Sequence, residues 1–539
     1  MKIETKPQKV YEEYTRGRSF NDAIDLYDEV DTNENMYVGK QWEGLNAPDL
    51  PKPVINVTHL VVSWAIAQIV SDNIAVSITA LKKNDDISLI SEALGTENAR
   101  VFEINNIKQK NRMIARNGGV HGDSAMYFWF DPQEESGQKV KGEIKSEIIE
   151  GRNVHFGNPY NRNPQQQPYL ILAQRKLVEE WRDEARANGR PEDEVLRIVG
   201  DENENRNEES NEFDLCTGLV KMWKKNGTVW AEIVTETATI RKPFNTGLKL
   251  YPLAWFVWEE VADQFHGRSI VTGLIQNQVA INRLYAMYIR SVEMNAFPKV
   301  VYDKQKLPDG WSNAVGKAIA ATPGVEGLNA AKIAQVIRGG DVSNQVMEAI
   351  DKAIAWIKES VGATDAALGN IRPDNAQAIV AASTQAAVPM ALVKLNHNDF
   401  VEQEVRIIND MMRNYYGTRE VAAESFKLDD GTLLTDEVGD PVKTISYDFS
   451  KLDNPNMRLN IDIGTAAYWN EIQESTTLDN LFKNSIISAR LYVESMPDNL
   501  IKNKPKIVEE LKKREAAAQA AATSPIMGNT PQTPSGSFQ

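Results

Sequence analysis

The sequence is poor in the residues that most often carry chemistry at neutral pH. Its 539 residues include one cysteine, Cys216, and five histidines. One cysteine cannot form a disulfide within the chain, and it excludes every cysteine-rich zinc motif. The histidines occur singly, without a second histidine or a paired carboxylate at the spacing that a helical metal site requires. We therefore predict no metal and no cofactor, and we expect Cys216, which falls inside a predicted strand, to be a buried apolar residue.

Long apolar segments and an excess of positive charge are also missing. Residues 1–18 carry charges throughout and lack the apolar stretch of a secretory signal, so we expect no export. The segments 53–71 and 376–393 carry no charge, but polar residues interrupt both, so we expect buried helices and no contact with a membrane. The 75 acidic and 60 basic residues give a formal net charge of -15. A chain with this balance has no general attraction for nucleic-acid phosphates.

No motif in the sequence amounts to a catalytic site. The nearest match to a phosphate-binding loop is Gly310–Ala318, which has five residues between its glycines where the motif needs four. Ala318 also stands where a hydroxyl would hold magnesium. The segment Gly118–Asp123 resembles a small catalytic turn, but a glycine-rich connection into the following strand explains it more simply. We predict no catalytic residue and no enzymatic activity.

The negative charge is concentrated in the segment 191–214, which has ten acidic and two basic residues. The remainder of the chain is therefore only mildly acidic. We expect this segment to be a solvated loop, and a specific acidic binding segment is the alternative.

Helical and strand patterns indicate an α+β fold. Residues 1–130 are expected to be mostly helical. Strands are then predicted at 126–132, 143–151 and 168–176, with a further one within 251–260. Asn226 and Gly227, between two alternating stretches, predict a β-hairpin because both residue types tolerate positive φ.

Two long helices with one apolar side each are predicted in the second half of the chain, at 270–294 and 342–361. An irregular segment, 299–341, separates them. On the first helix, Arg283 and Arg290 lie on a face that differs from most of the apolar side. A solvated basic edge is the first interpretation of this pair, and contact with phosphates is the second.

A further long helix follows a loop at 362–376. Residues 377–416 contain no glycine, which predicts a helix of about 40 residues that Pro389 should kink. Asp430 and Gly431 then predict a second hairpin. Helical patterns return within 465–514.

The order of these elements, from about residue 37 to residue 417, resembles that of the portal proteins of tailed bacteriophages. Three stretches carry the resemblance. Tyr37-x-Gly-x-Gln-Trp precedes a helix that bears Asn56, Gly267-x-Ser precedes a helix that bears glutamine and asparagine, and Pro298 lies where that helix ends.

The resemblance implies a portal fold with the following parts. They are an α+β wing at 1–260, a first stem helix at 261–295, a small α/β clip at 296–341, a second stem helix at 342–361, a tunnel loop at 362–376, a long kinked helix with wing strands at 377–464 and a helical crown at 465–514. The acidic loop 191–214 within the wing is not part of the family's pattern. The composition at the end of the chain predicts a disordered tail at 515–539.

The resemblance also implies a function. It predicts a homo-oligomeric ring, typically of twelve subunits, at one vertex of the virion capsid, assembled in the host cytoplasm. Double-stranded DNA would pass through the ring during packaging and ejection. The implied protein partners are the large terminase subunit, the major capsid and scaffold proteins, and a head-tail adaptor. The candidate DNA-channel residues are Arg283, Arg290, Asp365, Asn370, Arg372 and Asp374.

Two alternatives remain open at this point. The chain could be another head-tail structural protein, such as a scaffold or an adaptor, although such proteins are usually much shorter. It could also be an enzyme that processes nucleic acid with dispersed carboxylates, and such an enzyme should show cleavage that depends on divalent ions.

Overall fold

The computed structural model describes most of the chain between residues 3 and 511. The described residues are 3–44, 46, 48, 50–70, 74–80, 85–201, 214–297, 299–305, 307, 309–310, 312, 334–337, 345–363, 388–422, 444–452, 457–463, 478, 481–484, 486–495, 507–508 and 510–511. The chain divides into two compact units, Met1–Ile461 and Asp462–Gln539.

Helices dominate the first 121 residues, as predicted. They are α1 (Pro7–Ala23), α2 (Leu26–Val38), α3 (Val57–Ile69), α4 (Asp85–Ile104) and α5 (Ile107–His121). The apolar segment 53–71 forms α3, whose Val61, Val62, Ala65 and Ile69 side chains are fully buried. Among the described helices, none has the length and apolar character needed to cross a membrane.

One strand interrupts this helical region, which the sequence patterns did not predict. It is β1 (Ile74–Ala80), and it pairs with β16 (Met457–Ile463). The helical prediction for residues 1–130 was therefore wrong at β1.

Two antiparallel sheets form the β region, with strand orders β3-β2-β9 and β4-β5-β6-β7-β8. Their strands are β2 (Asp123–Asp131), β3 (Glu143–Glu150), β4 (Val154–Phe156), β5 (Tyr169–Leu177), β6 (Leu215–Lys225), β7 (Thr228–Val234), β8 (Thr239–Asn245) and β9 (Leu253–Val257). The predicted strands are confirmed. The hairpin between β6 and β7 is confirmed too, because Asn226 and Gly227 have φ values of 53° and 80°.

The beginning of the acidic segment is not the solvated loop that we expected. Within 191–201 lies α7 (Glu192–Val195), and the side chains of Val195 and Ile198 are fully buried. They pack in one apolar cluster with Trp181 of α6 (Val178–Ala187) and with Cys216. Residues 202–213 lie outside the described residues.

Cys216 is buried, as predicted, with 3% of its surface exposed. Burial raises the pKa of its thiol to about 12, so the reactive thiolate is scarce at neutral pH.

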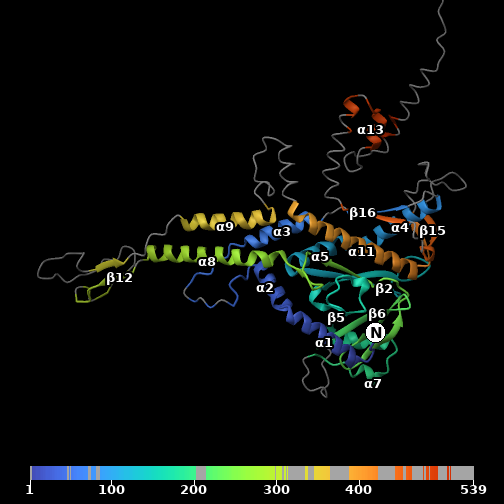
Figure 1. Ribbon diagram of the computed structural model, residues 1–539, viewed down its shortest axis with the longest axis horizontal. Coiled ribbons are helices and arrows are strands. Elements are labelled where there is room, and N and C mark those ends of the chain that lie inside the picture. The colour runs from blue at the N-terminus through green and yellow to red at the C-terminus, as the bar shows by residue number, and fades with distance from the viewer. Residues whose placement is uncertain are drawn as a thin grey trace, which may run out of the picture. The chain divides into compact units, whose positions relative to one another are not determined.

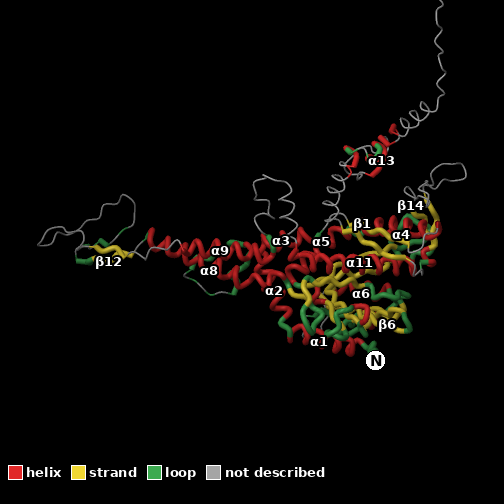
Figure 2. The backbone as a smooth tube through the Cα atoms, turned by 45° about the horizontal axis from the view of Figure 1, so that its top comes forward, coloured by secondary structure: helices red, strands yellow, loops and turns green. Residues whose placement is uncertain are grey.

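The two predicted long helices are present and lie side by side (Figures 1 and 2). They are α8 (Ile270–Ala296) and α9 (Gln345–Val361). The chain before α8 forms two short strands, β10 (Glu259–Glu260) and β11 (Gly267–Arg268), so the helix begins later than residue 261.

The segment after α8, expected to be irregular, contains strand structure at both ends. β12 (Lys299–Tyr302) pairs antiparallel with β13 (Ala334–Ile337).

The third long helix, α11 (Ala391–Tyr415), packs against β9 and β2. Pro389 lies in the 3-10 turn Val388–Met390 directly before it. Residues 364–387 lie outside the described residues, so the kink stays a prediction. After α11, β14 (Thr418–Ala422) pairs with β15 (Thr444–Asp448), while the predicted turn at Asp430 and Gly431 falls outside the described part. In the second unit, α13 covers Ala489–Ser495.

Candidate functional site at the base of the paired helices

The start of α8 is fixed by a serine cap and two glycines. Ser269 is the N-cap residue, and its Oγ accepts a hydrogen bond from the Val271 N–H at 3.0 Å. The same hydroxyl donates to the Gly119 carbonyl at 2.7 Å, which ties α8 to the end of α5. Gly122 and Gly267 lie backbone to backbone, and a Cβ on either would overlap the carbonyl oxygen of the other. The Gly118–Asp123 segment is therefore a structural connection, in agreement with the simpler interpretation of its sequence.

Further along α8, a buried glutamine caps the N-terminus of α3. Gln278 occupies the one polar position in the apolar side of α8, and its side chain is fully buried. Its Oε1 accepts hydrogen bonds from the Val57 N–H, the Thr58 N–H and the Thr58 hydroxyl, each at 3.1 Å. Its Nε2 donates to the Ile55 carbonyl at 2.6 Å. Because the first N–H groups of a helix have no partner within it, Gln278 satisfies donors that burial would otherwise leave unpaired.

Three more amide side chains extend this contact into what we call the amide junction: Gln41, Asn56, Gln278 and Asn282. Asn282 Nδ2 donates to Gln41 Oε1 at 2.5 Å, and Gln41 Nε2 donates to Asn56 Oδ1 at 3.0 Å. Asn56 Oδ1 also accepts the His59 N–H at 3.0 Å, as the N-cap of α3. Asn282 Oδ1 accepts from the Ile55 N–H and from Gln278 Nε2, both at 3.2 Å.

The amide junction brings together stretches that were singled out separately in the sequence for their resemblance to portal proteins. The Tyr37–Trp42 segment, the start of α3 and the middle of α8 meet at these four side chains. A buried polar network of this kind fixes one arrangement of its elements, since any other leaves amide groups unpaired. The sequence signal for it was a polar residue, Gln278, at a position where helical periodicity calls for an apolar one.

α2 holds the same end of α8 from another side. The Thr272 hydroxyl donates a hydrogen bond to Glu29 at 2.6 Å and accepts one from Asn33 Nδ2 at 3.0 Å. Next to them, Glu34 pairs with Arg116 at 2.5 Å and with His121 at 3.0 Å, both on α5. Burial alone would raise the pKa of Glu34, but the hydrogen bonds from Arg116 and His121 outweigh it and the pKa is lowered.

Away from this base, the paired helices expose large apolar side chains. Met287, Val292 and Met294 on α8 are between 44% and 50% exposed, and Trp356 on α9 is 65% exposed. Val292 belongs to the apolar side predicted from the sequence, which is thus buried near the base and half exposed at its last residue. Met287 and Met294 lie on another face, at helical spacing from Arg283 and Arg290.

Two of the six candidate DNA-channel residues lie among the described residues. Arg283 and Arg290 are both exposed on α8, and Arg290 forms an ion pair with Glu293 at 3.5 Å. Asp365, Asn370, Arg372 and Asp374 lie outside the described residues.

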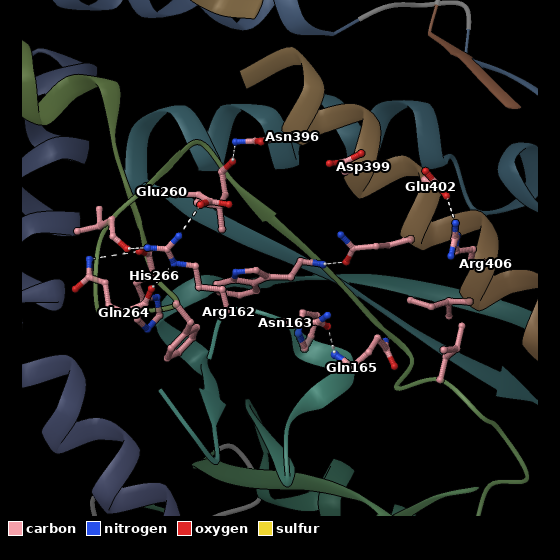
Figure 3. Close-up of a pocket in the computed structure, with 18 residues that line it drawn as sticks. Arg162, Asn163, Gln165, Glu260, Gln264, His266, Asn396, Asp399, Glu402 and Arg406 are labelled. Carbon is pink, nitrogen blue, oxygen red and sulfur yellow. Dashed lines mark hydrogen bonds and ion pairs between the residues drawn. The ribbon is translucent and has the colours of Figure 1, made fainter. Parts of the chain in front are cut away.

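A pocket of about 650 Å³ lies beside α11 (Figure 3). Its charged side chains are largely paired: Arg162 bonds Glu260 at 2.6 Å, and Arg406 bonds Glu402. His266, also in its wall, is hydrogen-bonded through both ring nitrogens, to Asp123 at 2.8 Å and to Asn21 at 3.0 Å.

The pocket offers hydrogen-bonding groups to a small polar molecule. Its histidine is already fully hydrogen-bonded, and its described lining includes no cysteine or serine. Over the described residues as a whole, no group of histidine, cysteine and carboxylate side chains could hold a metal ion.

A family model described as phage P22-like portal protein matches residues 115–423, which is more than half of the chain. The match begins within α5 and ends just after β14, so it includes α8, α9 and α11. No curated protein matches the chain.

Proposed function

The chain belongs to the phage P22-like portal protein family, and we propose that it forms the channel through which double-stranded DNA enters the capsid and later leaves it. Proteins of this family are structural rather than enzymatic, and they assemble as an oligomeric ring at a vertex of the phage capsid. We further propose that the ring has twelve copies and that α8 and α9 are its stem.

The observation that carries the proposal is the contrast between the two ends of α8. Its base is held by the amide junction and by α2, whereas Met287, Val292 and Met294 further along are half exposed. Large apolar side chains left exposed on a rigid helix pair favour burial against other protein surfaces. Neighbouring copies of the same chain in a closed ring provide that surface for every subunit.

The charge of the chain supports a channel in which DNA slides. Each phosphate that a protein neutralises releases counterions and strengthens binding, so a passage for moving DNA should make few such contacts. The net charge of -15 satisfies this requirement. In this proposal, DNA contacts Arg283 and Arg290 on α8 and the loop 362–376 without binding tightly to them.

We assign the docking of other proteins to the segment between the paired helices. Residues 296–341 connect α8 to α9 and begin and end with the strands β12 and β13. Such a connection, presented by two rigid helices, suits binding of the large terminase subunit and later of the head-tail adaptor. The wing region, 1–260, is proposed to face the major capsid and scaffold proteins.

The mass and shape of the assembled protein test the proposal. Native mass spectrometry of the full chain at micromolar concentration should give one large species near twelve times 60.3 kDa. Averaged electron-microscope images should show a ring with a central channel. Monomers and dimers alone, over a range of salt concentrations, would rule the ring out.

A further inference from the structure

The N-terminal helix α1 lies across the five-stranded sheet and contacts β4 and β6 (Figure 1). Val10 supplies its apolar contact, fully buried in a cluster with Leu219 of β6 and Tyr169 of β5. The next contact toward the C-terminus of α1 is charged. Glu13, only 5% exposed, forms an ion pair at 2.5 Å with Lys221 of β6, whose side chain is fully buried.

Lys221 is the central group of this contact. Besides its ion pair with Glu13, its Nζ donates to the Glu4 carbonyl at 2.5 Å, just before α1 begins. It also lies 5.2 Å from the centre of the Tyr169 ring. Both of its polar contacts are thus made with the N-terminal segment and not with the sheet to which it belongs.

The sheet nevertheless carries a second carboxylate next to Lys221. Glu232 of β7 is the residue directly opposite Lys221 in the antiparallel register, so both side chains point to the same face. Glu232 is fully buried. Within the described part of the chain, neither of its carboxylate oxygens has a hydrogen-bond partner.

We propose that α1 is a releasable strap, and that Lys221 exchanges Glu13 on the strap for Glu232 on the sheet when α1 leaves. Removing one member of a buried ion pair is normally unfavourable, because the other charge stays buried without a partner. Here the sheet retains an adjacent carboxylate for Lys221. The release of α1 is therefore less costly than its buried ion pair alone suggests.

The protonation of Glu232 gives this exchange a pH dependence. Burial raises the pKa of the Glu232 carboxyl to about 7, opposed by the charge of Lys221 and assisted by that of Glu13. The charged groups that act on it are Lys221 on β6 and Glu13 on α1. Next to these two, Tyr169 on β5 lies 5.2 Å from Lys221 Nζ, and Arg16 approaches Glu13 at 3.9 Å from α1 itself. Because the pKa of the Glu232 carboxyl is raised while α1 is docked, protonation of this carboxyl at low pH favours the docked state. That preference is lost as the pH rises toward about 7 and does not change further above it.

The strap connects two parts of the molecule. Asn21, near the end of α1, accepts a hydrogen bond from His266 just before α8, and α2 follows with its contacts to Thr272 of α8. Release of α1 from Lys221 would therefore loosen the link between the five-stranded sheet and the base of α8.

Hydrogen exchange of the full-length protein tests the strap. Exchange of α1 amides, corrected for the intrinsic effect of pH, should be faster at pH 8 than at pH 5.5. We expect exchange to be faster by a factor on the order of ten. This factor corresponds to a difference of one unit between the Glu232 pKa values with α1 docked and with α1 released. Helix α6 serves as the internal reference and should not change. Glu232→Gln removes the competing carboxylate, so α1 should be equally well protected at both pH values. Wild-type behaviour of this variant, or an equal pH effect in α6, would overturn the proposal.

A second pair of variants tests the other partner. Glu13→Gln should make α1 exchange fast at both pH values while β6 and β7 remain protected. The control is Glu12→Gln on the same helix, where the exposed Glu12 pairs only with Lys9 among described residues, and it should behave as wild type. Unchanged exchange of α1 in Glu13→Gln would contradict the proposal. Loss of protection in β6 and β7 would contradict it as well, because the sheet would then be unable to accommodate Lys221 without α1.

Discussion

Gln278, on α8, accepts hydrogen bonds from both the backbone N–H and the hydroxyl of Thr58, each at 3.1 Å, although 220 residues separate the two in the sequence. The contact joins the long helix to the capped end of α3 in a fully buried position. It gives α8 a fixed rotation about its own axis, because only one side chain of the helix can occupy this place.

Replacement of Gln278 by leucine should destabilise the protein strongly. The variant leaves the Thr58 N–H and the Thr58 hydroxyl without their acceptor, while the Val57 N–H keeps a hydrogen bond to the Ile55 carbonyl at 2.9 Å. We expect a loss of about 3 kcal/mol in the free energy of unfolding, since buried groups left unsatisfied cost about 1–3 kcal/mol each and partial relaxation recovers some of it. Urea denaturation monitored by circular dichroism measures this loss. Gln276→Leu, at an exposed position of the same helix, is the control and should change the stability by less than about 0.5 kcal/mol.

Glu404, on the buried side of α11, should make stability depend on pH. Burial raises the pKa of its carboxyl to about 8, although a hydrogen bond from Asn111 and the charge of Lys110 oppose the shift. Because the folded protein holds this proton more tightly than the unfolded chain, the contribution is fully present below the ordinary carboxyl pKa. It is lost as the pH rises to about 8.

The variant Glu404→Gln keeps the hydrogen-bonding shape and removes the titration. Its melting temperature should therefore fall less between pH 5 and pH 8 than that of the wild type. The partly exposed Glu402, paired with Arg406, offers the control Glu402→Gln, which should retain the wild-type pH profile. Parallel profiles for Glu404→Gln and the wild type would show that this carboxyl does not titrate in the predicted range.

The exposed Trp356 on α9 should contribute to the contact between subunits. Trp356→Glu places a charge where we expect a buried apolar contact and should weaken each contact by about 2 kcal/mol, or roughly thirtyfold in equilibrium constant. Analytical ultracentrifugation should show smaller species at concentrations where the wild type is a ring. Lys358→Gln makes the same change in charge on another side of α9 and should still assemble. Intact rings of Trp356→Glu would place this side chain outside the interface.

The segment between the paired helices should serve docking and not assembly. Deletion of residues 306–332, with the ends rejoined, retains both β12 and β13. Rings should still form, because the exposed apolar residues of α8 and α9 are untouched, while packaging of DNA should be abolished. Electron microscopy and a packaging assay with the terminase measure the two outcomes. Packaging at the wild-type level would refute the assignment of this segment.

The loop 362–376 can be tested with cysteines introduced at Ala367 and Asn370. The native Cys216 can remain, because it is buried and its thiol pKa is raised. If the loop faces the channel, these cysteines should crosslink to each other between subunits or to DNA trapped during packaging. Ready labelling from the outer surface of intact rings, with no crosslink, would exclude the channel position.

Local patterns predicted most of the elements of the fold. The β6–β7 hairpin followed from two adjacent residues that tolerate positive φ, and α8 followed from helical periodicity within its own sequence. Contacts between distant segments gave no such signal. The pairing of β1 with β16 and the burial of Val195 in an acidic segment both depend on partners far along the chain.

The candidate site was predictable only in its pieces. The stretches around Gln41, Asn56 and Gln278 could be singled out by resemblance, but not their hydrogen bonds to one another, because amide pairing leaves no spacing pattern. The same holds for Glu13, Lys221 and Glu232, which come from one helix and two strands. Of the candidate channel residues, Arg283 and Arg290 are exposed, and their contact with DNA remains a prediction.

The meeting of Gly122 and Gly267 has a mechanical consequence at the opposite end of α8. The helix of 27 residues that follows is about 40 Å long at 1.5 Å per residue. If it moved together with the groups bonded to Gln278 and Asn282, it would act as a lever whose pivot is this glycine contact. A tilt of about 5° at the pivot displaces the far end by roughly 3–4 Å over that length. Even the smallest side chain added at Gly122 would thus tilt α8 and displace β12, although no atom of the substituted residue comes near that strand.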